Sequence, residues 1–534
     1  MGRFDNLGSG LLSGFGEGDM YLPDSEPQPS DLVEFSGREG FTEVERYWLD
    51  RPYSFVVIIS NKDNDLLNYH VVEPELNDFE KRLLERIYSD VRNILISRGL
   101  GRGDRDDFLM EGIGQLLPEY GVELTAASFH KMYYYLRRSY IGYGKLEPIM
   151  SDEFVEDVSC DGYDIPLYVY HSKYRDIRTN IEFKEGELDS FVTRLAQHSG
   201  KHISVEKPIV STTLKDGSRA ELTLGREVAR HGSNFTIRKF SEDPFTPIDL
   251  IKSGTFSLEQ MAYLWLAIEN DKSLIFAGGT ASGKTTSMNA VSMFIPPRTK
   301  VVSIEDTPEL ELNHENWISS LTREGAGVES DVTMYTLLRS ALRHRPEYII
   351  VGEVRGEEAM TLFQAMNTGH TTYSTLHADS VETVVNRLEN PPINIPRSML
   401  QALDIISVQV LTRQGDERVR RSKVMSEIAG LDPRTGDINS NELYSWEGTT
   451  DEIDKVGKSV VLNDIQEETG ATDTEIKKEL RNREQVLEYM IEEDIDGYRR
   501  FTSMVMDYYT KPEDILDQVG GELVESVMDS DEDE

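Results

Sequence analysis

The stretch FAGGTASGKTTSMNAV, Phe276–Val291, decides the fold class of this chain. It has the spacing Gly-x-x-x-x-Gly-Lys-Thr, with Gly278, Gly283, Lys284 and Thr285 at the four fixed positions. The apolar run SLIFAG precedes the loop, and the helix-like run KTTSMNAVSMF begins inside it. A chance glycine-rich turn rarely has a strand before it and a helix after it, so the pattern predicts a phosphate-binding loop.

The chemistry of this loop follows from its residue types. Glycines let backbone N–H groups face a triphosphate, and the amino terminus of the helix adds a favourable dipole. We expect Lys284 to reach the β- and γ-phosphates of ATP, and the hydroxyl of Thr285 to bind Mg²⁺. The residues predicted to bind the nucleotide are Gly278, Gly279, Thr280, Ala281, Ser282, Gly283, Lys284, Thr285 and Thr286.

The composition disfavours several classes of protein. The 534 residues include 96 Asp plus Glu against 56 Lys plus Arg, a net charge of −40. This charge disfavours nucleic-acid binding, because phosphate backbones need basic stripes. The simplest interpretation of so much carboxylate is a halophile's cytoplasm, and a generic acidic protein is the alternative. The single cysteine, Cys160, excludes an internal disulfide and a cysteine-rich zinc site.

The sequence also bears on localisation. No apolar stretch approaches ~20 residues, so no transmembrane helix is expected. The amino terminus, MGRFDNLGSG, lacks the apolar core of a signal peptide. We therefore expect a cytoplasmic protein that contacts the membrane only through a partner.

The first part of the chain is predicted to be an α+β region. Residues 1–40 are rich in Gly, Ser, Pro and Asp, which predicts a disordered tail. Strand-like and helical runs follow over 41–145 and 146–243, and a proline-containing linker covers 244–250. Helices are predicted near 76–99, 128–140 and 181–198.

The second part of the chain alternates strands and helices. Over 251–412 this rhythm predicts a mostly parallel α/β sheet with helices on its faces. Antiparallel strands with a turn at DPRTGD, then helices near 473–493 and 498–507, complete this domain over 413–515. The composition of residues 516–534 predicts a solvated acidic tail.

Carboxylates follow two of the predicted strands. The run VVSIED ends in Glu305 and Asp306, and EYIIVGE ends in Glu353. Carboxyl ends of parallel strands gather at one edge of a sheet, so these groups should converge on the terminal phosphate. We assign Glu305 as the base that orients water and Glu353 as the carboxylate behind Mg²⁺, although the roles could be exchanged. The alternative for Asp306 is a helix cap.

Glu353 also narrows the class of protein. It stands where many proteins with this loop carry an aspartate, which disfavours small GTPases and most P-loop kinases.

Two histidines follow in GHTTYSTLHADS, His370 and His377. As an isolated pair they are poor metal ligands, because no third ligand has the right spacing. After the second carboxylate strand, we expect both to hydrogen-bond near the γ-phosphate and to report its presence.

Taken together, these motifs resemble those of a known family. GGTASGKTT, SIEDTPEL, EYIIVGEVRGEEA and GHTTYSTLHAD resemble, in order and spacing, the Walker A, Asp-box, Walker B and His-box motifs of type II/IV secretion-system ATPases. The upstream LEPIMSDEFVEDVSCDG is similar to the amino-terminal signature of that family. The resemblance covers most of the chain and is strongest to the archaeal branch, the motor ATPases of the archaellum and of type IV pili.

The resemblance implies a fold and further site residues. It implies a RecA-like P-loop ATPase domain with an α+β amino-terminal domain, arranged in a homo-hexameric ring with nucleotide between the domains. It assigns Arg219 as a catalytic charge offered to a neighbouring subunit, and Arg238 as a residue near the bound nucleotide. Arg323 is a further candidate. The alternative for each arginine is a surface or interdomain salt bridge.

The resemblance also implies a function. We expect ATP hydrolysis to power the assembly or rotation of an archaellum through a membrane platform protein. Assembly of an archaeal type IV pilus, or secretion, is the alternative. A nucleotide-gated scaffold with little hydrolysis is an alternative of another class, and the strand-end carboxylates argue against it. The net charge argues against DNA translocation.

Overall fold

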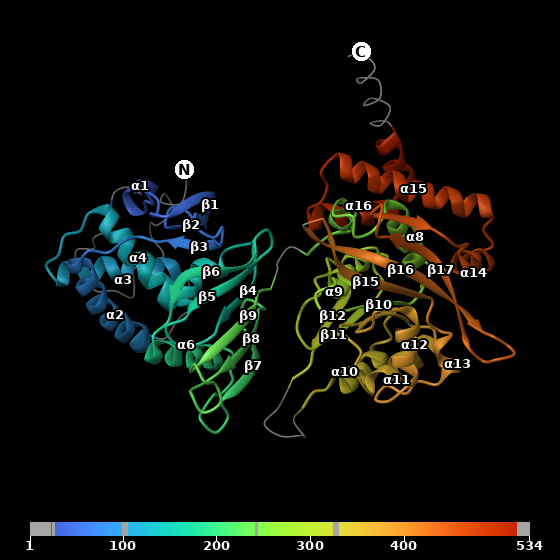
Figure 1. The fold of residues 1–534 in the computed structure, drawn as a ribbon, viewed down its shortest axis with the longest axis horizontal. Helices are drawn as coiled ribbons and strands as arrows, with labels where there is room; N and C mark the ends of the chain where they lie inside the picture. The colour runs from blue at the N-terminus through green and yellow to red at the C-terminus, as the bar shows by residue number, and fades with distance from the viewer. Residues whose placement is uncertain are drawn as a thin grey trace, which may run out of the picture. The chain divides into compact units, whose positions relative to one another are not determined.

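The computed structural model describes residues 23, 27–98, 105–240, 244–323, 331–415 and 417–520. The chain divides into two compact units, Met1–Phe240 and Ser241–Glu534 (Figure 1). Each unit has its own sheet and core, so each is described by itself.

The first unit is built on a nine-stranded sheet in the order β1-β2-β3-β6-β5-β4-β9-β8-β7. β3 pairs parallel to β6, so strands from 41–145 and from 146–243 form one sheet. β7 and β8 pair antiparallel and are joined by a turn at Asp216-Gly217. The strands are β1 Phe41–Asp50, β2 Ser54–Asn61, β3 Leu67–Val72, β4 Val155–Cys160, β5 Pro166–His171, β6 Arg175–Glu182, β7 Ile209–Thr213, β8 Arg219–Thr223 and β9 Asn234–Arg238.

Helices cover both faces of this sheet. The alternation along β2 sends Val57 toward a core shared with α2, α3 and α4, and Val56 toward a core shared with α6. Leu32 and Val33 are buried in the first of these cores, so the predicted disordered tail 1–40 includes residues of the folded unit. The helices are α1 Pro29–Leu32, α2 Asp78–Arg98, α3 Arg105–Glu119, α4 Ala126–Tyr140, α5 Glu147–Met150 and α6 Glu185–His198.

The second unit is also a nine-stranded sheet, in the order β12-β11-β13-β14-β10-β15-β16-β17-β18. The strands from β12 to β15 are parallel, and β16, β17 and β18 continue the sheet as antiparallel neighbours. This confirms the predicted α/β fold class. The strands are β10 Leu274–Gly278, β11 Val301–Glu305, β12 Trp317–Leu321, β13 Tyr348–Val351, β14 Thr371–Leu376, β15 Ile405–Gln414, β16 Glu417–Leu431, β17 Ile438–Glu447 and β18 Glu452–Lys455.

The alternation of side chains along β10 separates two cores on the faces of this sheet. Phe276 packs with α7 Pro247–Lys252, α8 Leu258–Glu269, α9 Lys284–Ser292, α14 Val460–Thr469, α15 Asp473–Glu492 and α16 Tyr498–Thr510. Ala277 packs with α10 Met334–Ala341, α11 Glu358–Asn367, α12 Val381–Glu389 and α13 Arg397–Leu400. The carboxy-terminal helices α15 and α16 thus belong to the same core as the loop strand. The predicted linker 244–250 includes the first turn of α7. Among the helices that the structure describes, none has the length and hydropathy needed to span a bilayer.

Candidate functional site

The glycine-rich loop joins β10 to α9 and has a backbone that only certain residues tolerate. Gly283 has φ 90°, and a Cβ there would lie 3.2 Å from the Arg420 side chain. At Gly278 a Cβ would lie 2.5 Å from the carbonyl oxygen of Gln409. Ala281 has φ 58°, a conformation that costs a non-glycine residue on the order of 1–3 kcal/mol. Such strain persists where a site needs a fixed shape.

The loop fits an oxyanion. Gly279, Thr280 and Ala281 are exposed at its crest, and the first turn of α9 points free backbone N–H groups toward it. Lys284 is only 8% exposed, and its Nζ donates to the carbonyl of Gly279 at 2.7 Å. Thr285 and Thr286 are half-buried on the same turn. The nine loop residues predicted to bind nucleotide therefore form one cradle.

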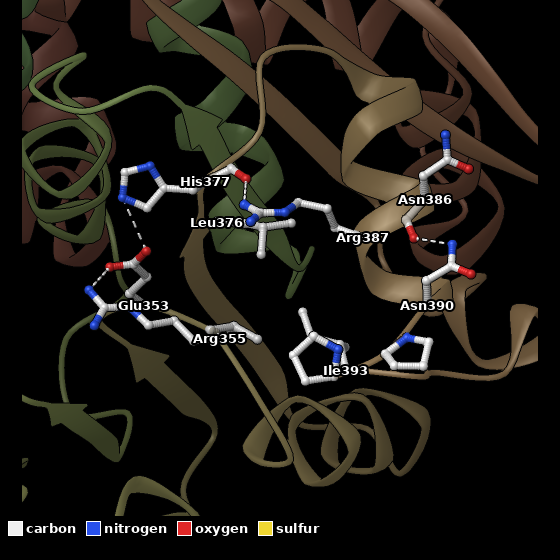
Figure 2. A pocket seen from close by; sticks show the side chains of 11 residues that line it. Glu353, Arg355, Leu376, His377, Asn386, Arg387, Asn390 and Ile393 are labelled. Carbon is white, nitrogen blue, oxygen red and sulfur yellow. Dashed lines mark hydrogen bonds and ion pairs between the residues drawn. The ribbon is translucent and has the colours of Figure 1, made fainter.

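A carboxylate and a histidine lie at the edge of the sheet that carries this loop. Glu353 follows β13 and His377 follows β14. The Oε1 of Glu353 is 3.3 Å from the Nε2 of His377, and its other oxygen accepts a hydrogen bond from Arg355. Figure 2 shows His377 and Arg355 on either side of the Glu353 carboxylate. A cavity of about 530 Å³ opens beside these groups and is closed on its far side by residues 386–393 (Figure 2).

Electrostatics link this pair to the loop lysine. Burial lowers the pKa of Lys284, and the charges of Glu353 and Glu309 oppose that shift. Burial also lowers the pKa of His377, the charge of Lys284 lowers it further, and the charge of Glu353 opposes the shift. Lys284, Glu353 and His377 are thus close enough to influence one another, as expected of groups that share a terminal phosphate.

Glu305 has a different environment from the one expected of a base. It ends β11, is 2% exposed, and its Oε1 accepts hydrogen bonds from the backbone N–H of Glu309 and Leu310, both at 3.0 Å. Its other oxygen is buried and has no hydrogen-bond partner among the described residues. Burial raises the pKa of Glu305 to about 7. The side chain therefore holds the following turn in place and is folded toward that turn.

Glu309 is a carboxylate that the sequence reasoning missed. It lies in the turn that Glu305 holds, it is exposed, and its charge acts on Lys284. The available signal was the second glutamate of EDTPEL, four positions after the strand ends. Asp306, beside them, is exposed and accepts a hydrogen bond from the Thr322 hydroxyl at 2.9 Å.

His370 does not belong to this site, and the prediction that it binds near the γ-phosphate is wrong. It precedes β14, whereas His377 follows it. Six strand residues at ~3.3 Å each separate the two histidines by about 20 Å. His370 therefore lies at the opposite edge of the parallel sheet, beside Thr368, whose hydroxyl is 3.4 Å from its Nδ1.

The predicted arginines divide between the two units. In the first unit, Arg219 begins β8 and Arg238 ends β9, and the two are register partners with exposed side chains. Like charges directly opposite each other in a sheet are unfavourable, which suits a surface that meets an anion. In the second unit, Arg323 is exposed and forms an isolated backbone bridge with Val332.

The side chains at this edge of the sheet can be compared with the donors that Mg²⁺ prefers. No cluster of three or more acidic, histidine or cysteine side chains suitable for a metal occurs among the described residues. Mg²⁺ commonly uses one or two protein oxygens and completes its octahedron with phosphate and water. The Thr285 hydroxyl on α9 and the Glu353 carboxylate at the same edge fit that donor set.

Comparisons with known sequences identify relatives. A family model described as type II/IV secretion system protein matches residues 173–506, and a PilB3-like amino-terminal model matches residues 17–75. An uncharacterised protein of Methanocaldococcus jannaschii is 36% identical over 85% of this chain and 82% of its own length. The type IV secretion system protein PtlH of Bordetella pertussis is 30% identical over 44% of this chain and 79% of its own length.

Solved structures of lower similarity accompany these relatives. The VirB11 ATPase of the Brucella suis type IV secretion system is 26% identical, and the match covers 52% of this chain and 91% of that one, with a TM-score of 0.28. The family assignment rests on the sequence matches, which together cover most of the chain. The chain belongs to the type II/IV secretion system protein family and is an ATPase.

Proposed function

We propose that this chain hydrolyses ATP at the loop 278–286 and uses the energy to drive a membrane-bound filament or secretion machine. The observation that carries the proposal is the convergence of Lys284, Glu353 and His377 at the carboxyl edge of one parallel sheet. A phosphate cradle alone would suit any nucleotide-binding protein. The added strand-end carboxylates supply what hydrolysis requires, and they disfavour a scaffold that binds ATP without turnover.

Each residue of the site has a proposed task. Lys284 and the loop amides bind the β- and γ-phosphates, and Thr285 and Glu353 would hold Mg²⁺. The ion would neutralise charge on the phosphate oxygens. His377, whose Nε2 lies 3.3 Å from Glu353, responds to the presence of the terminal phosphate.

We propose Glu309, in place of Glu305, as the group that orients the attacking water. Glu309 is exposed and acts on Lys284, whereas both hydrogen-bond contacts of Glu305 go to the turn. Glu305 is then a positioning residue, because its acceptor oxygen fixes the backbone that presents Glu309.

The assembly is proposed from the family resemblance. The chain would work as a cytoplasmic homo-hexamer, contact the membrane through a platform protein and bind no nucleic acid. Arg219 would offer its charge to the site of a neighbouring subunit, where such a group stabilises transition-state charge, and Arg238 would lie near the nucleotide. Their exposure on adjacent strands supports this assignment.

The machine itself is proposed to be a type IV pilus or secretion system, with the archaellum as the second candidate. The PilB3-like amino-terminal match and the secretion-system family match support this order. The test is to delete the gene in its own organism and complement it with wild type or Lys284→Ala. Wild type should restore surface pili and the variant should not. Normal piliation in the deletion strain, with loss of swimming, would favour the archaellum.

A further inference from the structure

One charged side chain reaches the phosphate loop from β16, which lies on the opposite side of β10 from β13 and β14. Arg420, on β16, donates its Nε to the carbonyl of Ala281 at 3.1 Å. Its Cδ lies over the turn at Gly283, where an added Cβ would approach it to 3.2 Å. Arg420 is 139 residues from Ala281 in sequence, so the pairing is made by the sheet and no local motif reveals it.

The order of strands gives the nucleotide site a direction. β10 carries the loop, with β14 and β13 on one side and β15 and β16 on the other. Glu353 and His377 follow β13 and β14, so the terminal phosphate belongs on that side. A nucleotide that leads with its terminal phosphate therefore extends its nucleoside end toward β15 and β16. Arg420 of β16 lies on that side of the loop.

The chemistry of Arg420 suits that end of the ligand. The Nε bond fixes the guanidinium beside the loop, and its two terminal nitrogens have no hydrogen-bond partner within the described part of the chain. A planar guanidinium stacks on aromatic faces and is always charged. Because the group is already oriented by Ala281, little side-chain freedom is lost when a flat ring packs on it.

From this geometry we propose that Arg420 binds the nucleoside end of the bound nucleotide, stacking its guanidinium on the purine base. The inference rests on the proposed function, because it requires a nucleotide in the loop. It assigns a binding role to β16, a strand outside the four motifs of the loop and its carboxylates. The loop motifs would bind the phosphates, and Arg420 would distinguish a nucleotide from an inorganic polyphosphate.

The experiment is calorimetric titration of the full chain with two ligands, ADP and inorganic tripolyphosphate. Arg420→Ala should weaken ADP binding about 5- to 30-fold, the range of a desolvated cation–π contact, and change tripolyphosphate binding less than about twofold. Tripolyphosphate binding also reports that the variant is folded and that the loop keeps its shape.

Arg418→Ala is the matched control. Arg418 is exposed on the same face of β16, two residues earlier, and makes no contact that the structure records with the loop. Its removal deletes the same charge and should leave both affinities unchanged. Arg420→Gln keeps an N–H donor for Ala281 but lacks the planar cation, so it should resemble Arg420→Ala.

Three results would overturn the inference. They are unchanged ADP affinity in Arg420→Ala, an equal loss for tripolyphosphate, or recovery of ADP binding in Arg420→Gln. In the last two cases Arg420 would shape the loop or bind phosphate. If the wild type bound neither ligand, the proposed function itself would fail, and the two failures are therefore distinguishable.

Discussion

Glu305 shows how far the sequence determines a functional side chain. The motif places a carboxylate at the end of β11, and the parallel sheet brings that strand to the correct edge. It does not determine the side-chain direction, which depends on two backbone N–H groups in the next turn. A buried acceptor that satisfies these donors is fixed by tertiary packing, and packing has no local signature. Glu309, presented by the same turn, was missed for that reason.

The division of roles between these two glutamates is testable. Glu309→Gln should bind ATP with near-normal affinity and lose about 100- to 10,000-fold in turnover, the usual contribution of a positioned base. Glu305→Gln keeps an acceptor oxygen for the turn and should retain most of the activity. Single-turnover phosphate release and nucleotide titration measure both. Normal turnover in Glu309→Gln together with its loss in Glu305→Gln would restore the base role to Glu305.

Burial of Glu305 also predicts a pH dependence. Its pKa rises to about 7 from an ordinary value of 4.5, so the folded chain holds this proton more tightly than the unfolded chain. The resulting stability is fully present below pH 4.5 and is lost as the pH rises through about 7. Glu305→Gln should therefore gain stability relative to wild type between pH 5 and pH 8, by up to about 3 kcal/mol. Paired thermal unfolding curves at the two pH values measure this gain, and a constant difference would contradict the assigned environment.

The wrong prediction for His370 is explained by the strand that separates it from His377. TTYSTL forms β14, and the residues that flank a six-residue strand must lie at opposite edges of its sheet. Their spacing along a strand therefore separates the two histidines. The same spacing along a helix would place them on one face. The loop residues 278–286, in contrast, are contiguous, so local geometry alone brings them together.

The helices and strands show which signals the chain carries locally. Strong periodicity gave the helices near 76–99, 128–140 and 473–493, which appear as α2, α4 and α15. α3 went unpredicted because its sequence contains glycines and Pro118, residues that weaken any helical pattern. α8 is apolar on all sides, with nine consecutive buried residues, so its pattern lacks a polar face. Because α8 has no amphipathic stripe, tertiary burial holds it in place.

Arg483 joins three of these helices and supplies a prediction about their packing. It lies on α15, its side chain is 3% exposed, and it pairs with Glu269 of α8. Its guanidinium also lies 5.6 Å from the ring of Trp265 and 5.3 Å from that of Tyr508 on α16. Arg483→Ala removes a buried guanidinium from a half-exposed carboxylate and from two aromatic rings, and should destabilise the second unit by about 1–3 kcal/mol.

Arg481→Ala is the control for this prediction, since Arg481 is exposed on the same helix. It should change stability by less than about 0.5 kcal/mol. Urea unfolding followed by tryptophan fluorescence compares the two variants, because Trp265 reports on this core. Equal midpoints for Arg483→Ala and wild type would show that α15 does not depend on this side chain.

The division into two units places two of the predicted arginines on a different body from the loop. Arg219 and Arg238 belong to the first unit, and Lys284 belongs to the second. The hexamer proposed above requires the arginine of one subunit to serve the site of another. Co-expression of Arg219→Ala and Lys284→Ala chains in mixed rings tests this. Each variant alone should be nearly inactive, and mixed rings should regain a measurable part of the activity, because some sites then combine an intact loop with an intact arginine.

Mixed rings no more active than either variant alone would assign Arg219 to its own subunit or to a salt bridge. Arg230→Ala, mixed in the same way, is the control, because Arg230 is an exposed arginine of the same unit outside β8 and β9. Its rings should be active without mixing.

The most direct measurement is phosphate release from ATP by the wild-type chain and by Lys284→Ala, in high salt with Mg²⁺ present. The wild type should turn over ATP, and the variant should fall to background while its thermal unfolding remains that of the wild type. Turnover in Lys284→Ala equal to that of the wild type would contradict the site at residues 278–286 and everything assigned around it.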